Sequence, residues 1–412
     1  MKLNSTAGKT NPVLFFILLV AALGYFVDIY DLVLFSVIRV KSLQGIGISN
    51  PARLTSLGLL LLNIQMGGML AGGFVWGIIA DKKGRLTVLF GSILLYSVAN
   101  ILNGLVHDIY SFGVLRFIAG FGLAGELGAG ITLVSETMSK ENRGYGTMLV
   151  AGVGLLGAVV ASLVAGRFSW RISFFVGGGL GILLLLLRVG VAESGMYSML
   201  MRENVQKGSL RQLFSSGERV KKYLCCCTIA LPLWFMVGIL VTLGPEFGKV
   251  LHIQGAVSAG KGILWTYMGI TAGDLLTGLL SQLWKTRKKV VALFLVFTGA
   301  GFIIYLNASG ESLETYYWIC FGMGASTGFW VIFVTLAAEQ FGTNLRGTVT
   351  TSVPNVIRGS VIPLTALFQL LRTWLPFQHA ALAVGLMTIL LAFLGLSGLK
   401  ETFGKDLDYM EV

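Results

Sequence analysis

The chain alternates along its whole length between long apolar blocks and short polar stretches. A helix that crosses the hydrocarbon core of a bilayer needs about 20 consecutive, mostly apolar residues, and twelve blocks meet that length. They span residues 13–40, 54–80, 86–105, 112–138, 145–166, 172–192, 223–244, 263–284, 290–306, 316–341, 348–371 and 380–399. None alternates at period two, and lipid offers the backbone no hydrogen-bond partners, so we predict twelve transmembrane helices rather than barrel strands.

The composition excludes a water-soluble fold. Hydrophobic residues make up 55% of the 412 residues, charged residues only 12%, and the mean hydropathy is +0.80. A soluble domain has about 45–50% apolar and about 25% charged residues, so packing alone cannot hide this much apolar surface from water. The 55 glycines show no triplet period and there are only 4 cysteines, which excludes a collagen and a disulfide scaffold. We therefore predict an all-α membrane protein.

The excess of basic residues fits the topology of a membrane protein. The formal net charge is +12, and the basic residues cluster in short tracts between the apolar blocks. None of these tracts is interleaved with aromatic residues as a nucleic-acid groove would be. An N-terminus inside the cell places most of them in the cytoplasm, as the positive-inside rule requires. We therefore expect a multi-pass protein of a bacterial inner membrane, in contact with lipid, with both termini cytoplasmic and no nucleic-acid partner.

The longest polar stretch divides the predicted helices into two groups of six. We expect a cytoplasmic N-terminus (1–12), a first six-helix bundle (13–192), a cytoplasmic linker (193–222), a second six-helix bundle (223–399) and a cytoplasmic C-terminus (400–412). Short patterns recur at a nearly constant offset in the two groups. They pair Ser135-Glu136 and Arg143-Gly144 with Ala338-Glu339 and Arg346-Gly347, Gly120 and Gly122 with Gly322 and Gly324, Gly77 with Gly278, and Glu193-Ser194 with Glu401-Thr402. Two parallel repeats around a central site are a transporter architecture.

Several motifs stand at fixed places relative to the predicted helices. They are Gly77, Asp81, Gly84 and Arg85 in the spacing Gly-x-x-x-Asp-basic-x-Gly-basic, Arg116 with Gly120 and Gly122, Trp170-Arg171, Glu193-Ser194, Glu401-Thr402, and Asp28-Ile29-Tyr30-Asp31. Taken together and in their order along the chain, these motifs resemble those of the major facilitator superfamily, and in particular its sugar-porter and metabolite:proton symporter branch. The resemblance covers nearly the whole chain and implies a secondary transporter rather than an enzyme.

Two departures from the family pattern narrow this expectation. In the second half, Gln282 stands where the Asp of the Gly-x-x-x-Asp motif would be, followed by Lys285, Arg287 and Lys288. In the fifth predicted helix, Gly152, Gly154 and Gly157 occupy the region of the motif associated with drug:proton antiporters, but the proline of that motif is absent. The second departure favours a metabolite transporter over a drug exporter.

The first predicted helix carries two carboxylates. Asp28 and Asp31 are three positions apart, so they share one face and cannot both be ionised comfortably in a low dielectric. In the family, an acidic residue at the second of these positions pairs with the fourth-helix arginine, which the resemblance places at Arg116. We hypothesise that Asp31 and Arg116 form the proton-coupling pair, so that a proton on Asp31 releases Arg116 and lets the two halves rock. The alternative is a static ion pair that only fixes the helix register.

Two further carboxylates lie in the middle of predicted helices. A charged residue there costs about 2.5–3.5 kcal/mol on insertion scales, so each needs a reason. Glu126 lies in the glycine-rich fourth helix and is either a second proton site or substrate contact, or a carboxylate hydrogen-bonded inside the first bundle. Asp274 lies among glycines in the eighth helix, has less support from the family, and is not expected to be the primary site.

Arg358 is the most informative cation because it lies far from any predicted loop. A guanidinium binds a carboxylate through two parallel hydrogen bonds, so an organic anion is the leading substrate class. The alternative is that Arg358 serves as an ion-pair partner for Asp274 or Glu126. Other polar and aromatic residues that could line the same site are Tyr30, Asn63, Gln65, Trp234, Tyr267, Trp330 and Asn355.

Residues at the predicted cytoplasmic helix ends are expected to act as a gate. Contacts between acidic and basic residues of the two halves would hold the inner side shut while the site faces outward. A single surface ion pair contributes only ~0–1 kcal/mol, so a network is needed to bias the two states. The alternative is charge that only sets topology. The set comprises Gly77, Asp81, Gly84, Arg85, Glu136, Arg143, Glu193, Glu339, Arg346 and Glu401.

These patterns together predict a proton-coupled symporter that moves a small organic solute by alternating access and as a monomer, with a carboxylate as the leading substrate class. No cofactor is expected besides the coupling proton, because the cysteines have no metal-ligand spacing and there is no Walker loop. Within transport, the alternatives are a sugar or polyol porter and an exporter of a metabolite or drug. Outside transport they are a transporter-like nutrient sensor, which would usually carry a long signalling tail, and a passive channel, which would not need two motif-bearing halves.

Overall fold

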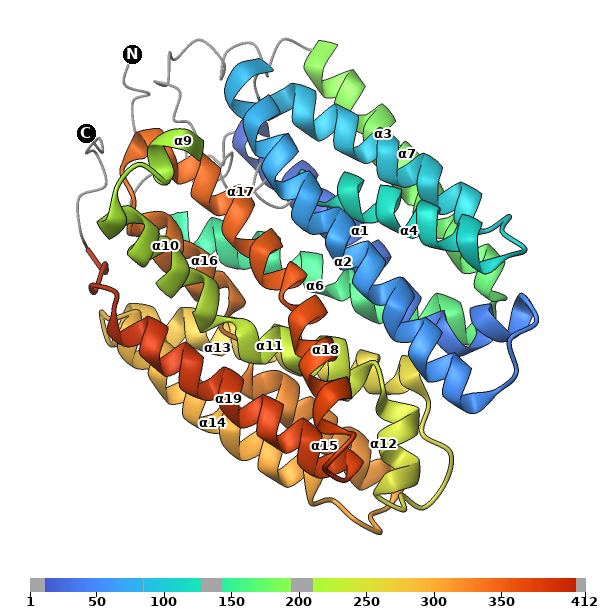
Figure 1. Cartoon of the computed structure of the whole chain (residues 1–412). Helices are drawn as coiled ribbons and strands as arrows, with labels where there is room; N and C mark the ends of the chain where they lie inside the picture. Colours follow the sequence, from blue (N-terminus) through green and yellow to red (C-terminus); the bar gives the residue numbers. More distant parts are fainter. Residues whose placement is uncertain (1–11, 84, 127–142, 194–209, 405–412) are drawn as a thin grey trace.

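The structure is a computed structural model, and it describes residues 12–83, 85–126, 143–193 and 210–404 (Figure 1). These residues form a bundle of long helices without a strand among them, and the one isolated bridge joins Gln254 and Ser312. Eight helices of the described part are long and apolar enough to cross a bilayer, or nine if one bent pair counts as a single span. The predicted all-helical membrane fold is confirmed.

The helices of the first half follow the predicted apolar blocks. They are α1 (Pro12–Gly45), α2 (Pro51–Lys83), α3 (Arg85–Asn103), α4 (Ile109–Leu123), α6 (Arg143–Arg167) and α7 (Trp170–Glu193). Asp108 caps α4 by accepting the N–H groups of Tyr110 and Ser111, each at 2.9 Å. Hydrogen bonds from the hydroxyl and N–H of Ser111, and then from the N–H of Tyr110, lower the pKa of this exposed carboxylate. The cap satisfies first-turn donors and thereby fixes where α4 begins.

Three predicted spans of the second half are broken. The span predicted at 223–244 bends by 42° near Pro232, which has no N–H to continue the hydrogen-bond ladder. The span predicted at 316–341 is interrupted at residues 327–329, and the span at 348–371 is interrupted at Ser360. The helices are α9 (Leu210–Leu213), α10 (Gly217–Ile229), α11 (Leu231–Phe235), the π-helix η1 (Met236–Val241), α12 (Gly244–Val250), α13 (Ala259–Leu283), α14 (Lys288–Leu306), α15 (Leu313–Ser326), α16 (Trp330–Glu339), α17 (Thr343–Gly359), α18 (Val361–Leu371) and α19 (Phe377–Ser397).

Glycine-mediated helix contacts repeat in the two halves. The contacts are Gly68 with Phe117, Gly72 with Phe121 and Gly120 with Gln65 between α2 and α4, and Gly269 with Phe321, Gly273 with Ala325 and Gly324 with Thr266 between α13 and α15. A side chain at any of these glycines would collide with the facing backbone, so the helices approach this closely only where glycine is present. The predicted duplication is therefore present in the packing. Its register differs from the prediction, because Gly120 corresponds to Gly324, whereas Gly322 faces open space.

The two halves meet along a seam formed by equivalent helix pairs. α2 packs against α17, and α6 packs against α13, with α1 also in contact with α13. Small residues allow the approach: Gly73 of α2 lies against Asn355 of α17, and Gly359 of α17 lies against Leu70 of α2. We call the end of the bundle where α2 ends and α9 lies the linker end, and the end where α1 ends the opposite end (Figure 1).

Candidate functional site

A buried ion pair joins the two halves near the middle of the seam. Nη2 of Arg358 in α17 lies 3.3 Å from Oδ2 of Asp28 in α1, and both side chains are fully buried. Asn355, one turn before Arg358, accepts a hydrogen bond from its Nη1 at 3.5 Å. The same asparagine donates to the carbonyl oxygen of Ala124 in the first half at 2.9 Å. The arginine predicted to bind an anion thus lies at a polar contact between the halves.

Two tryptophans border this ion pair. The guanidinium of Arg358 lies 5.7 Å from the ring centre of Trp234, and Trp330 packs edge-on against Trp234 at 6.2 Å. Both indoles are buried, and neither indole N–H has a hydrogen-bond partner in the described part of the chain. Tyr267 and Tyr25 lie within electrostatic range of Arg358. The sequence analysis missed Tyr25, although its i, i+3 spacing to the aspartate of α1 places it on the same face.

We refer to these residues as the Arg358 cluster, which comprises Asp28, Trp234, Trp330, Asn355 and Arg358. Four of the residues predicted from sequence to bind substrate are therefore brought together here, and Tyr267 lies nearby. The cluster combines a guanidinium, a carboxylate that competes for it, and two flat apolar surfaces that each carry an unpaired donor. Such a site can hold a planar anion.

The predicted ion pair between Asp31 and Arg116 is not formed. Arg116 is fully buried, and its guanidinium donates to the amide oxygens of Asn100 (2.7 Å), Asn103 (3.3 Å) and Gln65 (3.4 Å). Among the described residues, neither carboxylate oxygen of Asp31 has a hydrogen-bond partner, although Arg116 remains within electrostatic range. Amides of α2 and α3 thus satisfy the guanidinium in place of the carboxylate.

The two carboxylates of α1 point in different directions. Asp28 reaches Arg358 in the second half, whereas Asp31 lies against a glycine of α7 within the first half. Tyr30 and Gln65 also belong to the first half, because the Tyr30 hydroxyl donates to a carbonyl of α7 at 3.0 Å and Gln65 donates to a carbonyl of α1 at 3.4 Å. The structure does not bring Tyr30 or Gln65 to the Arg358 cluster. The spacing of three positions between Asp28 and Asp31 did not reveal that their side chains point towards different halves.

Glu126 is held inside the first half by an arginine that the sequence analysis missed. Two Nη atoms of Arg188 in α7 each donate to one oxygen of Glu126, and both side chains are buried. Of the two interpretations left open for Glu126, the geometry supports the hydrogen-bonded carboxylate. Arg188 lies within an apolar run, so only its charge could have revealed it. Because Arg358 pairs with Asp28, the alternative that it serves Glu126 or Asp274 is wrong.

A second polar contact crosses the seam between α2 and α18. The side-chain amide of Asn63 donates to the hydroxyl of Thr365 at 2.8 Å, and that hydroxyl lies 3.0 Å from the Asn63 carbonyl oxygen. Asn63 was predicted to line the site. In this structure it joins the halves, and its polar atoms are satisfied by Thr365.

Asp274 of α13 has a backbone donor but no cation beside it in the described part of the chain. Its Oδ1 accepts the N–H of Val331 in the first turn of α16 at 3.3 Å, and its Oδ2 is buried without a partner. The residue lies beside the break between α15 and α16, where Thr277, one turn later, donates to the carbonyl of Gly328 at 2.8 Å.

A second ion pair joins the halves towards the opposite end. Nη2 of Arg39 in α1 donates to both carboxylate oxygens of Glu246 in α12, at 2.7 and 2.9 Å, and to the carbonyl of Thr242 at 3.2 Å. The Arg39 side chain is fully buried. The hydroxyl of Thr55 in α2 donates to the same glutamate at 3.1 Å, and the hydroxyl of Thr242 donates to that of Ser36 at 3.0 Å. None of these residues was predicted from sequence, because Arg39 and Glu246 lie towards the ends of their helices, where charge is ordinary.

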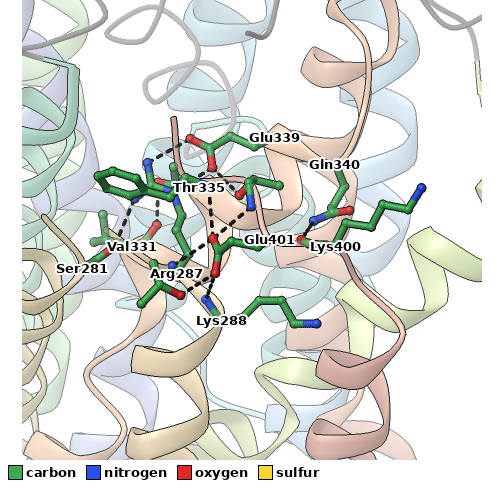
Figure 2. A network of polar contacts seen from close by, with 12 residues as sticks. Ser281, Arg287, Lys288, Val331, Thr335, Glu339, Gln340, Lys400 and Glu401 are labelled. Carbon is green, nitrogen blue, oxygen red and sulfur yellow. Dashed lines mark hydrogen bonds and ion pairs between the residues drawn. The ribbon is translucent and has the colours of Figure 1, made fainter. Parts of the chain in front are cut away.

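A polar network occupies the linker end of the second half (Figure 2). Arg287 donates through Nε and Nη2 to the two oxygens of Glu339 at 2.7 and 2.9 Å, and Thr402 donates to Glu339 at 2.6 Å. Glu401 accepts the hydroxyl of Thr286 and the N–H of Arg287 at 3.0 Å. The segment after α19 is thereby tied to the start of α14 and the end of α16.

Glu401 stays ionised in this network. Burial raises its pKa, but hydrogen bonds from the Thr286 hydroxyl and three backbone N–H groups outweigh burial and lower the pKa to about 2. A lowered carboxylate pKa stabilises the fold above the unfolded-state value, and the contribution is lost only as the pH falls towards 2. Glu401 therefore does not change its charge in the physiological pH range.

The structure describes only some of the residues predicted to form a gate. Glu339 and Glu401 meet Arg287, which was absent from the predicted set, and their contacts lie within the second half rather than between the halves. Gly77 faces open space, and Arg346 is half-buried on α17. Gly84, Glu136 and the side chains of Asp81, Arg85, Arg143 and Glu193 lie outside the described residues.

Comparisons with known proteins agree with this architecture. The sequence profile of the Major Facilitator Superfamily matches residues 14–364. A benzoate transport protein of Acinetobacter baylyi is 24% identical over 382 residues, which cover 82% of this chain and 79% of that protein. A gentisate transporter of Corynebacterium glutamicum is 23% identical over 366 residues, which cover 84% and 79%. The structure of the proton:xylose symporter XylE bound to 6-bromo-6-deoxy-D-glucose shares the fold, with a TM-score of 0.72 at 16% identity over 97% of this chain and 98% of that one.

Proposed function

The chain belongs to the Major Facilitator Superfamily, and from this premise we propose that it is a proton-coupled symporter for a small aromatic carboxylate. The observation that carries the proposal is the buried ion pair between Asp28 and Arg358, which lies on the seam beside two tryptophans. The carboxylate class is also supported by the relatives named for benzoate and gentisate transport.

Arg358 supplies the binding energy for the substrate carboxylate. A carboxylate that enters the cluster competes with Asp28 for the guanidinium and gains charge-assisted, bidentate hydrogen bonds. Asp28 then loses its cation in a buried site, where an unpaired anion is strongly disfavoured, and takes up a proton. Substrate binding and proton binding thus become one event.

The indoles of Trp234 and Trp330 favour a flat, aromatic substrate. Stacking and edge contacts between aromatic rings contribute about 0.5–1.5 kcal/mol each beyond simple burial. The two unpaired indole N–H groups add donors for a ring hydroxyl or ring nitrogen of the substrate. An aliphatic anion would satisfy Arg358 but leave both ring faces and both donors unused.

Asp31 and Arg116 support the conformational part of the cycle. The guanidinium is bonded to amides and makes no ion pair with Asp31, which is the arrangement expected when Asp31 carries a proton. The carboxylates of α1 then titrate as a coupled unit that holds one proton with Asp28 paired and two with Asp28 displaced. The cycle moves the halves about the seam, with the linker end facing the cytoplasm of a bacterial cell, and needs no cofactor besides the proton.

The second candidate function is a sugar or polyol porter, because the fold is shared with a xylose symporter. Neutral sugars do not displace Asp28 from Arg358, so this alternative leaves the central ion pair without a role. An exporter of a metabolite or drug would use the same site with the opposite direction of net flux. A nutrient sensor of this fold would bind the carboxylate without exchanging it.

Counterflow into proteoliposomes tests the proposal. Vesicles loaded with unlabelled benzoate, gentisate or xylose are mixed with the same labelled compound, and uptake is then repeated with an inward pH gradient. We expect exchange of an aromatic carboxylate and up to about tenfold accumulation per pH unit for each proton carried. The charge-removing change Arg358→Ala should weaken binding by at least about 100-fold, since two hydrogen bonds are lost and those to charged groups contribute about 1.5–3 kcal/mol each.

The controls separate the site from general effects on the protein. Arg53→Ala removes an exposed arginine from the start of α2 and should leave exchange unchanged. Arg358→Lys keeps the charge but not the bidentate geometry, and we expect it to lose at least tenfold in affinity. Exchange of xylose alone, with Arg358→Ala indistinguishable from the wild type, would replace the carboxylate proposal by the sugar porter.

A further inference from the structure

Asp274 is a buried carboxylate that the mechanism above does not use. It is 2% exposed, and its Oδ2 has no hydrogen-bond partner in the described part of the chain. Glu126 and Asp28 are also buried, but each has an arginine beside it. Asp274 therefore lacks the compensation that these two carboxylates have.

Charged groups of the helices packed around α13 do not compensate Asp274. η1 carries none, and no ion pair to Asp274 occurs among the described side chains. Within electrostatic range lies Tyr25 of α1, which is itself neutral at physiological pH. The charged residues of these helices, by position, are Asp28, Asp31, Arg39 and Lys41 of α1, Arg143 and Arg167 of α6, Glu246 and Lys249 of α12, Lys261 of α13, Lys288 and Lys289 of α14, Glu314 of α15 and Glu339 of α16.

The surroundings of Asp274 make both protonation states accessible in turn. An ionised carboxylate with one unpaired oxygen in a dry site is much less stable than the neutral acid. The N–H of Val331 and the N-terminus of α16 favour the anion, but the hydrogen bond reaches Oδ1 alone. A proton is therefore held while the site is closed to water, and it can leave when water reaches Oδ2.

The repeat makes Asp274 equivalent to a residue that lies on the seam in the first half. At the offset that relates Gly68 to Gly269, Asp274 corresponds to Gly73 of α2, which lies against Asn355 of the other half. α13 likewise packs against α6 of the first half, and the residue after Asp274 lies against a glycine of α6. Rocking of the halves consequently changes the packing around the carboxylate.

We infer that Asp274 binds and releases a second proton in each transport cycle. The inference rests on the proposed function, in which the carboxylates of α1 take up one proton with the substrate. A monocarboxylate carried with two protons moves one net positive charge, so transport should be driven by the membrane potential as well as by the pH gradient. With one proton, the same transport would be electrically neutral.

Infrared spectroscopy tests whether Asp274 is protonated. Purified wild-type protein at neutral pH should show the carbonyl stretch of a buried, protonated carboxyl group. Asp274→Asn, which is nearly isosteric, should remove part of this band, whereas Glu314→Gln, at an exposed carboxylate in the first turn of α15, should leave it unchanged. An unchanged band in Asp274→Asn would contradict the inference, and this measurement needs no substrate.

Transport driven by a potassium gradient tests the second proton itself. Proteoliposomes with valinomycin and about a 20-fold outward potassium gradient take up labelled benzoate at constant pH. One net charge per cycle allows the accumulation ratio to rise up to about 20-fold in the wild type. Asp274→Asn should retain counterflow and pH-driven uptake, but its response to the potassium gradient should fall below about 2-fold.

The outcomes separate the two proposals. If the wild type exchanges no carboxylate, the proposed function fails, while the infrared band still decides whether Asp274 holds a proton. Uptake that follows pH but not potassium in the wild type would contradict the second proton. So would a variant that responds like the wild type, or one that loses counterflow together with accumulation, because Asp274 would then be a structural residue.

Discussion

Individual buried carboxylates in this protein are stabilised in different ways. Glu126 has a guanidinium on both oxygens, Asp28 contacts Arg358 through one oxygen, and Asp31 and Asp274 have no cation in hydrogen-bond contact among the described residues. Since a charge at a helix centre costs about 2.5–3.5 kcal/mol, an arginine offsets this cost for Glu126 and Asp28 but not for Asp31 and Asp274. A guanidinium bound to both oxygens, rather than burial alone, thus distinguishes Glu126 from Asp28 and Asp274, the two carboxylates proposed to take up and release protons.

Removal of Arg188 should destabilise the first half without affecting proton coupling. Arg188→Met leaves Glu126 buried without its guanidinium, and breaking one side of a buried pair typically costs about 3–5 kcal/mol. We expect a clear fall of the melting temperature in detergent. The double variant with Glu126→Gln should recover most of this loss, because no charge is then left buried. A double variant no more stable than Arg188→Met, or one without pH-driven uptake, would contradict the structural role.

Residue positions were easier to predict from sequence than residue partners. A charge inside an apolar block is visible by inspection, and Asp28, Glu126 and Arg358 were all identified in this way. Which charges meet depends on the rotation of each helix about its axis, and one residue of rotation turns a side chain by about 100°. For that reason the sequence analysis paired Asp31 with Arg116, whereas amides bind the arginine in the structure.

At the scale of helices, glycine determines which pairs approach closely. Gly324→Ala should destabilise the second half, because the added carbon would collide with the carbonyl oxygen of Thr266. Forcing an extra methyl group into such a contact typically costs about 1–3 kcal/mol. The matched control is Gly322→Ala in the same helix, where the added carbon meets open space and alanine favours the helix by up to about 1 kcal/mol. Equal melting temperatures of the two variants would show that this contact does not hold α13 and α15 together.

The breaks inside helices could not be predicted from hydropathy. An apolar block gives the length of a span but not whether its hydrogen-bond ladder continues. Pro232 was a local signal for the bend after α10, whereas the break at 327–329 occurs where Thr327 and Thr298 hydroxyls satisfy carbonyl oxygens of α15. Such a replacement of backbone donors by side chains depends on the neighbouring helix. It is therefore a tertiary effect that the local sequence does not contain.

For the whole molecule, the duplication was visible in the sequence because both halves use glycines at equivalent helix–helix contacts. The contacts between the halves could not be seen in the sequence, because the residues that form them have no unusual feature within their own helices. Arg39 and Glu246 illustrate this: they lie in helices far apart in the chain, and only the fold makes a pair of the buried arginine and the half-buried glutamate. Alternating access requires that such contacts between the halves break and form again during the cycle.

The pair between Arg39 and Glu246 should keep the opposite end closed. It connects α1 and α2 with α12, and Ser36 lies buried beneath it in contact with Thr242. A cysteine at Ser36, in a background without the 4 free cysteines, reports opening through its rate of labelling by a maleimide in detergent. Glu246→Gln leaves the fully buried guanidinium of Arg39 without its anion, and we expect labelling at least about tenfold faster.

Charge reversal provides the decisive control for the pair between Arg39 and Glu246. Arg39→Glu with Glu246→Arg restores an ion pair of opposite polarity, and labelling at position 36 should return most of the way to the original rate. Arg53→Gln removes an exposed charge from the same end of the molecule and should have no effect. Fast labelling in the charge-reversed protein would mean that local packing, not attraction between the halves, protects Ser36. Slow labelling in Glu246→Gln would mean that the remaining contacts along the seam are sufficient to hold this end closed.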